Sequence, residues 1–126
     1  MKKAKVLIVD DSSLARRTVR QLLEAMGHTV VEATDGLQAL EKFHLEKPEL
    51  VILDMVMTGM YGLDVLAQMR ALDPAVSVIV ATADVQQSTL EQVKAGGAKG
   101  LLTKPVTREK LTGAVETVLG GGDLWS

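Results

Sequence analysis

The sequence predicts an α/β domain in which an open parallel sheet is covered by helices on both faces. Five short apolar runs alternate along the chain with five segments of helical periodicity. Most of the runs are continuous rather than alternating, which is typical of strands buried on both faces of a parallel sheet. Polar residues gather just after the runs, at the edge where such sheets bind ligands.

The five predicted strands account for the apolar runs. They span Lys5 to Val9, Thr29 to Ala33, Leu50 to Leu53, Ser77 to Ala81 and Gly100 to Leu102. Because helical segments separate them, right-handed crossovers limit the topology to a few arrangements.

The helical segments follow each strand. In chain order they are Ala15 to Met26, Leu37 to Leu45, Leu63 to Met69, Gln86 to Ala95 and Thr107 to Leu119. The first is clearly amphipathic, and Gly27 ends it. The fourth has few large apolar residues, so we expect it to be weakly packed and mobile. The triple glycine Gly120 to Gly122 ends regular structure, which predicts a domain over 1–119 and a glycine-rich tail over 120–126.

Length and composition fit a single domain. The 126 residues are 47% hydrophobic, enough for one core without a disulfide. Fourteen Lys and Arg against sixteen Asp and Glu give a net charge of −2, so no positive field would attract nucleic acid or an anionic membrane. The chain has no cysteine, and the apolar run Val6 to Val9 is too short for a signal peptide or a membrane span. We therefore expect a cytoplasmic protein with no nucleic-acid or membrane partner.

Polar signatures follow four of the five strands: Asp10 and Asp11, Asp54, Thr82, and Lys104. Each has a plain alternative, such as a helix cap, a turn residue, a β-branched strand end or a solvated charge. Together they favour a site, because the carboxyl ends of parallel strands meet at one edge.

A metal ion is indicated if the strand order is 2-1-3-4-5, since Asp10, Asp11 and Asp54 then share one cleft. Carboxylates this close repel one another unless a cation intervenes, and Mg²⁺ prefers such oxygen ligands while keeping positions for phosphate oxygens. The alternative is a different strand order, in which the carboxylates never meet.

With a cation bound, a carboxylate oxygen of Asp54 could attack a phosphorus whose charge the Lys104 ammonium also neutralises. The Thr82 hydroxyl could donate to a phosphoryl oxygen, and the small Ala83 would leave room for the group to enter.

The sequence closely resembles the receiver domains of two-component response regulators, especially the single-domain chemotaxis type, from about Lys3 to Leu119. The shared motifs are Val6 to Asp11, the Asp35-Gly36 turn, Leu50 to Asp54, Met57 through Gly62, Thr82-Ala83 and Lys104-Pro105.

The resemblance implies a flavodoxin-like, doubly wound fold with strand order 2-1-3-4-5. It implies that Asp54 accepts a phosphoryl group from phosphohistidine on a sensor histidine kinase or a histidine phosphotransfer domain, and that the signal passes on by binding an output protein. Such a domain catalyses only its own phosphotransfer and autodephosphorylation. By the same resemblance, Mg²⁺ and the phosphoryl group have a specific set of contacts. The metal ligands would be Asp10, Asp11, Asp54 and the backbone carbonyl of Val56, and the phosphoryl contacts would be Thr82, Ala83 and Lys104.

Several positions differ from the family's usual pattern. Thr58 stands where proline is common, so the loop after Asp54 would be less rigid. Leu101 stands at the switch position where an aromatic is usual, and Val106 where phenylalanine is frequent. Val56 and Asp84 occupy the positions that flank the approach of water to the phosphoryl group in the family.

Two further features have alternative interpretations. Arg16, Arg17 and Arg20 lie on the first helix, which in this family often docks the histidine donor, although a solvated basic face explains them equally well. Trp125 could anchor a partner, but we expect its tail to be disordered. A glycine-rich tail also resembles a linker to a further domain.

Other functions remain open. A degenerate receiver could bind partners constitutively, as Leu101 and Val106 suggest. A haloacid-dehalogenase-like phosphatase would need a second Asp where Val56 stands. A flavin mononucleotide carrier shares the topology, but Asp10 and Asp11 would repel its phosphate.

Overall fold

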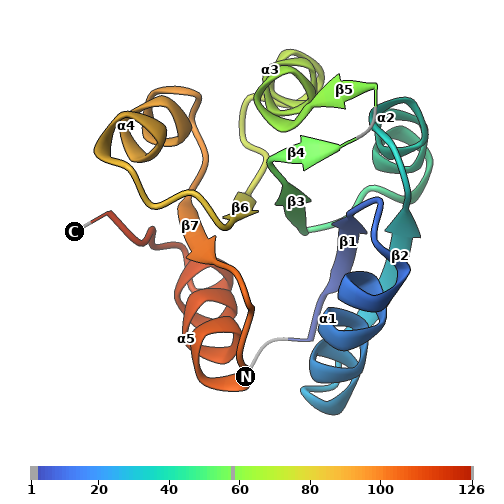
Figure 1. Ribbon diagram of the computed structural model, residues 1–126. Helices are drawn as coiled ribbons and strands as arrows, with labels where there is room; N and C mark the ends of the chain where they lie inside the picture. The colour runs from blue at the N-terminus through green and yellow to red at the C-terminus, as the bar shows by residue number, and fades with distance from the viewer. Residues whose placement is uncertain (1–2, 58, 126) are drawn as a thin grey trace.

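The main sheet has the predicted arrangement. The computed structural model describes residues 3–57 and 59–125. Five parallel strands hydrogen-bond in the order β2-β1-β3-β6-β7. Counted over the five long strands, this is the order 2-1-3-4-5 of a flavodoxin-like fold, and five helices accompany them (Figure 1).

The elements alternate along the chain with few interruptions. The main strands are β1 (Lys5–Val9), β2 (Thr29–Ala33), β3 (Leu50–Asp54), β6 (Val78–Thr82) and β7 (Gly100–Thr103). The helices are α1 (Ser13–Ala25), α2 (Gly36–Glu46), α3 (Gly62–Leu72), α4 (Gln87–Ala95) and α5 (Arg108–Leu119).

Helices cover both faces of the sheet, so its strands are buried on both sides. Figure 1 shows α1 and α5 on one side of the sheet and α2, α3 and α4 on the other. Alternate residues of β1 point to opposite faces: Val6 and Ile8 join the core cluster with α1 and α5, whereas Leu7 and Val9 join the cluster with the other helices. This burial explains why the strands are continuously apolar in sequence.

Three strands differ from their predicted boundaries. Each of β3, β6 and β7 ends one residue later than predicted, β7 at Thr103 rather than Leu102, and β6 also begins one residue later, at Val78. β1 and β2 begin and end as predicted, but Asp54 and Thr82 are the last residues of β3 and β6 rather than the first residues after them. The sheet continues to these polar residues because Asp54 pairs with Ala81 and Thr82 pairs with Thr103. Their side chains are thus held by strand backbone and not by a turn.

Local sequence signals set the helix ends. The Ser12 hydroxyl accepts from Ala15 N at 3.2 Å and caps α1, and the Thr107 hydroxyl caps α5 in the same way. Gly27 follows α1 with φ +92°, a conformation that strongly favours glycine. α4 buries only Thr89 and Val93, which agrees with the prediction of light packing.

A short ribbon between β3 and α3 was not predicted. Val56–Met57 forms β4 and Met60–Tyr61 forms β5, and the two pair antiparallel. The prediction for Thr58 falls between them and lies outside the described residues.

The described end of the chain packs against the domain, so the prediction of a disordered tail is wrong for Leu124 and Trp125. Leu124 N donates to the carbonyl of Lys99 at 2.7 Å, and Trp125 Nε1 donates to the carbonyl of Ala98 at 2.8 Å. Leu124 packs against the core under α1 and α5, and Trp125 against the core on the opposite face. The tail therefore crosses over the edge strand β7. Within residues 3–57 and 59–125, no helix has the length and apolar character needed to traverse a bilayer.

Candidate functional site

Three aspartates meet at the carboxyl edge of the sheet. Asp10 directly follows β1, and the pairing of Val9 with Leu53 brings it beside Asp54 at the end of the adjacent strand β3. Asp11 continues into the turn before α1. Carboxylate oxygens of the three residues lie within 4.8 Å of one another. The predicted convergence of these carboxylates is confirmed.

The three carboxylates differ in their exposure. Asp10 and Asp54 are buried, with 6% and 7% of their surface accessible, whereas Asp11 is exposed. Asp10 is also fixed by its neighbours, because its Oδ1 accepts from Ser12 N at 2.9 Å and its backbone N donates to Ala33 O. A cation bound here would lie between two rigid, sheltered carboxylates and one that reaches toward solvent.

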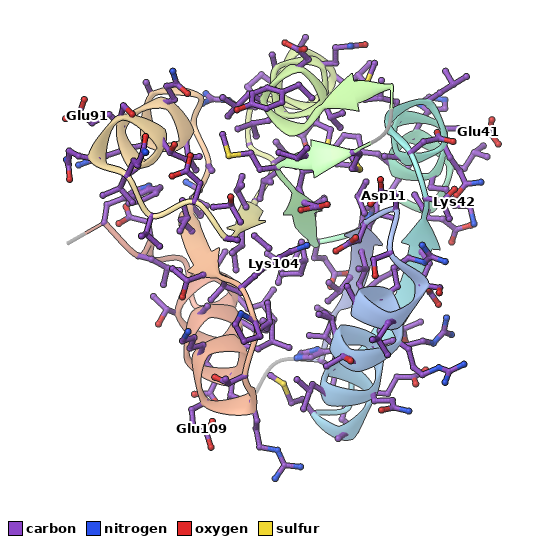
Figure 2. All side chains as sticks on the ribbon, in the orientation of Figure 1. Asp11, Glu41, Lys42, Glu91, Lys104 and Glu109 are labelled. Carbon is purple, nitrogen blue, oxygen red and sulfur yellow. The ribbon has the colours of Figure 1, made fainter. Side chains whose placement is uncertain are left out.

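Lys104 approaches the cluster from the loop after the edge strand β7. Its Nζ lies 3.0 Å from Asp54 Oδ1 and 3.1 Å from Asp10 Oδ2. Its backbone N also donates to the carbonyl of Thr82 at 2.8 Å, which ties the loop to β6. Figure 2 labels Lys104 and Asp11 near the ends of these strands. One ammonium thus bridges two of the three carboxylates.

The site carries more negative than positive charge. Burial raises the pKa of Asp54 above its ordinary value, the nearby charges of Asp10 and Asp11 add to this, and the hydrogen bond from Lys104 opposes it without cancelling it. Burial alone would lower the pKa of Lys104, but its hydrogen bonds to Asp54 and Asp10 raise it, so the ammonium stays protonated. The remaining excess of negative charge favours binding of a cation.

The donor set fits a small, hard cation. Carboxylate oxygens are the ligands that Mg²⁺ and Ca²⁺ prefer, and three carboxylates are enough to anchor Mg²⁺ while it keeps other positions for water or phosphate. The chain has no cysteine, so it offers no thiolate to a softer metal.

A cavity of about 490 Å³ opens beside Asp54 and extends between α1 and the loop after β7. Asp54, Ala83 and Lys104 contribute to its lining together with apolar residues such as Val19 and Val106. The small side chain of Ala83 is exposed at this opening. A group that enters through the cavity can therefore reach the Asp54 carboxylate.

Thr82 is buried at the end of β6, and its hydroxyl oxygen accepts a hydrogen bond from the loop that follows. Its Oγ1 accepts from Asp84 N at 3.1 Å. The Asp84 carboxylate in turn accepts from Gln86 N at 2.9 Å and from the Thr89 hydroxyl at 2.6 Å, and these bonds lower its pKa. Thr82 is thus linked to the start of α4.

The remaining predicted residues occupy more peripheral places. Leu101 is half-buried in β7 and packs against the core on the α2–α4 face. Val56 lies in β4, two residues after Asp54, with 65% of its surface exposed. Coordination by its backbone carbonyl stays a prediction.

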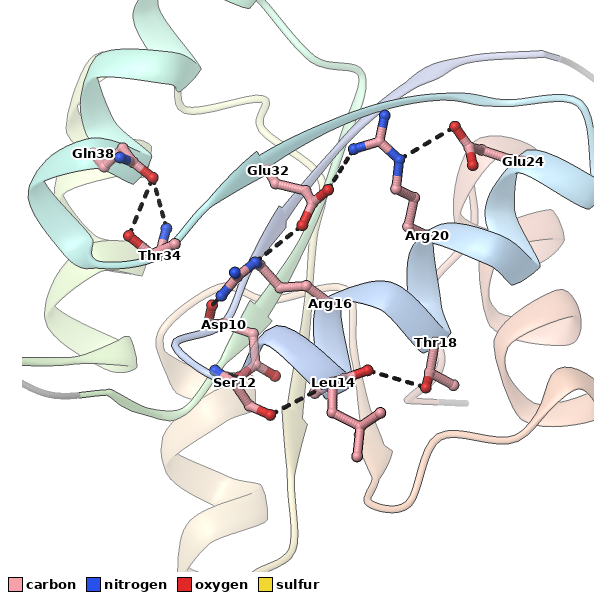
Figure 3. A network of polar contacts seen from close by, with 11 residues as sticks. Asp10, Ser12, Leu14, Arg16, Thr18, Arg20, Glu24, Glu32, Thr34 and Gln38 are labelled. Carbon is pink, nitrogen blue, oxygen red and sulfur yellow. Dashed lines mark hydrogen bonds and ion pairs between the residues drawn. The ribbon is translucent and has the colours of Figure 1, made fainter.

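The sequence interpretation missed how the first helix supports the site. Figure 3 shows Arg16 and Arg20 reaching from α1 to Glu32 on β2. Arg16 Nε lies 3.0 Å from Glu32 Oε1, Arg20 also pairs with Glu32, and Arg20 Nε lies 3.2 Å from Glu24 Oε2. Of the three arginines on α1, Arg17 is exposed, whereas Arg16 and Arg20 are partly buried, so neither a docking face nor a fully solvated face describes all three. A glutamate inside an otherwise apolar strand was the signal that could have revealed this network.

The ion pairs also set the charge of Glu32. Burial alone would raise its pKa, but the hydrogen bonds from Arg20 and Arg16 hold it below the ordinary value. Glu32 is therefore ionised at neutral pH and keeps its two arginine partners.

Comparisons with known proteins agree with this geometry. The family model described as "Response regulator receiver domain" matches residues 6–116. The chain is similar to the chemotaxis protein CheY of Listeria monocytogenes, with 37% identity over 89% of this chain and 95% of the relative. It is also similar to the sporulation initiation phosphotransferase F of Bacillus subtilis, with 34% identity over 94% of this chain and 96% of the relative. Among solved structures, the chemotaxis protein CheY4 of Vibrio cholerae superimposes with a TM-score of 0.87 and 31% identity, covering 91% of this chain and 98% of that one.

Proposed function

Because the chain belongs to the response regulator receiver family of two-component signalling, we propose that it is a switch controlled by phosphorylation of Asp54 with Mg²⁺ bound. The phosphoryl group would come from a phosphohistidine on a histidine kinase or phosphotransfer domain. The modified domain would then bind an output protein.

One observation carries this proposal: buried Asp54 lies among two further carboxylates and a lysine at the end of a cavity. Phosphoryl transfer depends mainly on positioning and on neutralising the charge of the transferred group. Asp10, Asp11, Asp54 and the Val56 carbonyl would hold Mg²⁺, which would neutralise charge on the phosphoryl oxygens.

The protein side chains have separate roles in the transfer. An Asp54 carboxylate oxygen forms the new O–P bond as the N–P bond to the donor imidazole breaks, and the imidazole leaves with the bonding electron pair. The Lys104 ammonium, already 3.0 Å from Asp54 Oδ1, would form an ion pair with a phosphoryl oxygen and so neutralise part of its charge. Ala83 leaves space beside the carboxylate, and the Thr82 hydroxyl, whose oxygen accepts from Asp84 N, can at the same time donate a hydrogen bond to a phosphoryl oxygen.

The name of one relative supports the transfer chemistry, since the Bacillus subtilis protein is called a phosphotransferase. The hydrogen bonds around Thr82 suggest how the signal leaves the site. Its present partner Asp84 is hydrogen-bonded to Thr89 of α4, so a change at Thr82 reaches that helix directly. Leu101 packs into the core beside α4 and would adjust with it.

Acetyl phosphate tests the proposal without knowledge of the kinase. The wild-type chain, incubated with acetyl phosphate and Mg²⁺, should gain the mass of one phosphoryl group, and EDTA should prevent the gain. The Asp54→Asn variant should gain none. The Asp64→Asn variant, which changes an exposed aspartate on α3, should behave like the wild type. Equal labelling of wild type and Asp54→Asn, or no labelling of either, would refute the proposal and leave a constitutive binding domain as the alternative.

A further inference from the structure

The backbone between Asp10 and Asp11 is held by a side chain that takes no direct part in the carboxylate cluster. Arg16 Nη1 donates to the carbonyl oxygen of Asp10 at 2.7 Å, while Arg16 Nε binds Glu32 at 3.0 Å (Figure 3). The Arg16 side chain is only 15% exposed. One guanidinium therefore joins the loop after β1 to the neighbouring strand β2.

We propose that Arg16, anchored by Glu32, is a positioning residue that sets the direction of the Asp10 and Asp11 carboxylates and thereby the affinity of the site for Mg²⁺. This inference rests on the proposed function, since it assumes that the three aspartates bind the ion.

The geometry explains why a contact to a carbonyl has this effect. The Asp10 carbonyl belongs to the peptide plane that links Asp10 to Asp11, and a charge-assisted hydrogen bond is short and directional. Asp10 N is already held by Ala33 O on β2. Because both the N–H and the carbonyl of Asp10 are held, the backbone direction from Asp10 to Asp11 is fixed. This direction places the carboxylates of both residues beside Asp54.

Glu32 makes the anchor rigid. It accepts from Arg16 and also from Arg20, and Arg20 is held in turn by Glu24. The planar fork of arginine can contact Glu32 and the Asp10 carbonyl at once, which the single ammonium of a lysine does less well. Glu32 also offsets the positive charge of Arg16, which would otherwise repel a cation close by.

The sign of the change in metal affinity distinguishes positioning from simple electrostatics. Removal of a positive charge near an acidic cluster should strengthen Mg²⁺ binding if charge alone matters. Loss of a residue that orients the metal ligands weakens binding, typically by 10–100-fold for such supporting contacts. We expect Arg16→Ala to weaken Mg²⁺ binding about tenfold, the lower end of that range.

Calorimetric titration of Mg²⁺ into the metal-free protein provides the measurement, at a temperature where circular dichroism shows every variant folded. Arg16→Lys keeps the charge but loses the fork, so we expect it to bind Mg²⁺ several-fold more weakly than the wild type. Arg17→Ala removes the same charge one residue away, from an exposed side chain, and should leave the affinity unchanged or slightly higher. Arg20→Ala should have a smaller effect than Arg16→Ala, because it loosens Glu32 without breaking the contact to Asp10.

Two outcomes separate this inference from the proposed function. If the wild type binds Mg²⁺ and folded Arg16→Ala binds it equally or more tightly, the positioning role is wrong while the proposed function stands. If Arg16→Ala does not fold, Arg16→Lys decides, and wild-type affinity in that variant would refute the inference. A wild type that binds no Mg²⁺ would overturn both.

Discussion

Asp54 is buried and also lies beside two other carboxylates, and both properties make its ionised form less favourable. Among residues 3–57 and 59–125, its ion-pair partner is the Lys104 ammonium at 3.0 Å, which it shares with Asp10. A buried carboxylate with too little compensating charge is costly to ionise. The empty site therefore carries an uncompensated cost, which a bound cation would reduce.

This balance predicts that Asp54→Asn stabilises the metal-free protein at neutral pH. The folded state raises the pKa of Asp54 above its ordinary value of 3.8, so the protonated form is the one that the fold prefers. The stabilising contribution of this group is full below pH 3.8 and is lost as the pH rises through the raised pKa. The gain in unfolding free energy from Asp54→Asn should thus be absent in acid and should increase toward pH 7.

Urea unfolding between pH 4 and pH 8 in EDTA measures this difference, and added Mg²⁺ should stabilise the wild type more than the variant. A variant less stable than the wild type at pH 7 in EDTA would contradict the account. It would show that the ion pair with Lys104 outweighs the burial of the charge.

At the residue scale, the sequence was sufficient to predict which side chains meet but not how they are held. Asp10 and Lys104 follow strands and Asp54 ends one, so their convergence follows from the rule that parallel strands end at one edge. The contacts of Arg16 with Glu32 and the Asp10 carbonyl depend on the distance between α1 and β2, which no sequence pattern specifies.

At the scale of elements, α3 begins unusually close to the strand that carries Asp54. Gly62 N donates to the carbonyl of Met55 at 2.7 Å. A Cβ atom at Gly62 would lie 2.5 Å from the Asp54 carbonyl oxygen and 2.8 Å from Met55 Cα. Both are backbone atoms of the region that positions Asp54, so they cannot move aside without disturbing the site.

We therefore expect Gly62→Ala to destabilise the protein by about 1–3 kcal/mol, the usual cost of forcing extra volume into a packed region. Gly113→Ala is the control, because Gly113 also lies in a helix, α5, and an added Cβ there would meet nothing within 4 Å. Urea unfolding of both variants checks the prediction. A cost for Gly62→Ala no larger than that for Gly113→Ala would contradict it.

The sequence predicted the main elements well because their patterns are local. Burial on both faces makes the strands continuously apolar, and Gly27 ends α1 in the conformation expected of it. The errors in the strands have two physical causes. Asp54 and Thr82 extend their strands through backbone pairing, which polar side chains do not reveal, and the two-residue strands β4 and β5 are too short to show a period.

At the scale of the whole molecule, the strand order brings together residues far apart in the chain. β1 and β3 are neighbours, which joins Asp10 to Asp54, and the loop after the edge strand β7 brings Lys104 across to both. The site is therefore a product of the topology rather than of any one segment.

The end of the chain shows where prediction from sequence fails at this scale. A glycine-rich segment with one tryptophan is typical of a flexible tail. Instead, Trp125 donates to the carbonyl of Ala98 and lies 6.0 Å from Lys94 Nζ, with Leu124 on the other side of β7. These contacts form only once β7 and α4 are in place.

The most direct test of the central claim is a crystal structure grown with Mn²⁺, a divalent ion that binds similar oxygen sites and has a measurable anomalous signal. The account predicts one anomalous peak per chain, within coordination distance of carboxylate oxygens from Asp10, Asp11 and Asp54, with Lys104 beside it. Carboxylates pointing apart around an empty edge, or a peak bound elsewhere on the chain, would contradict it.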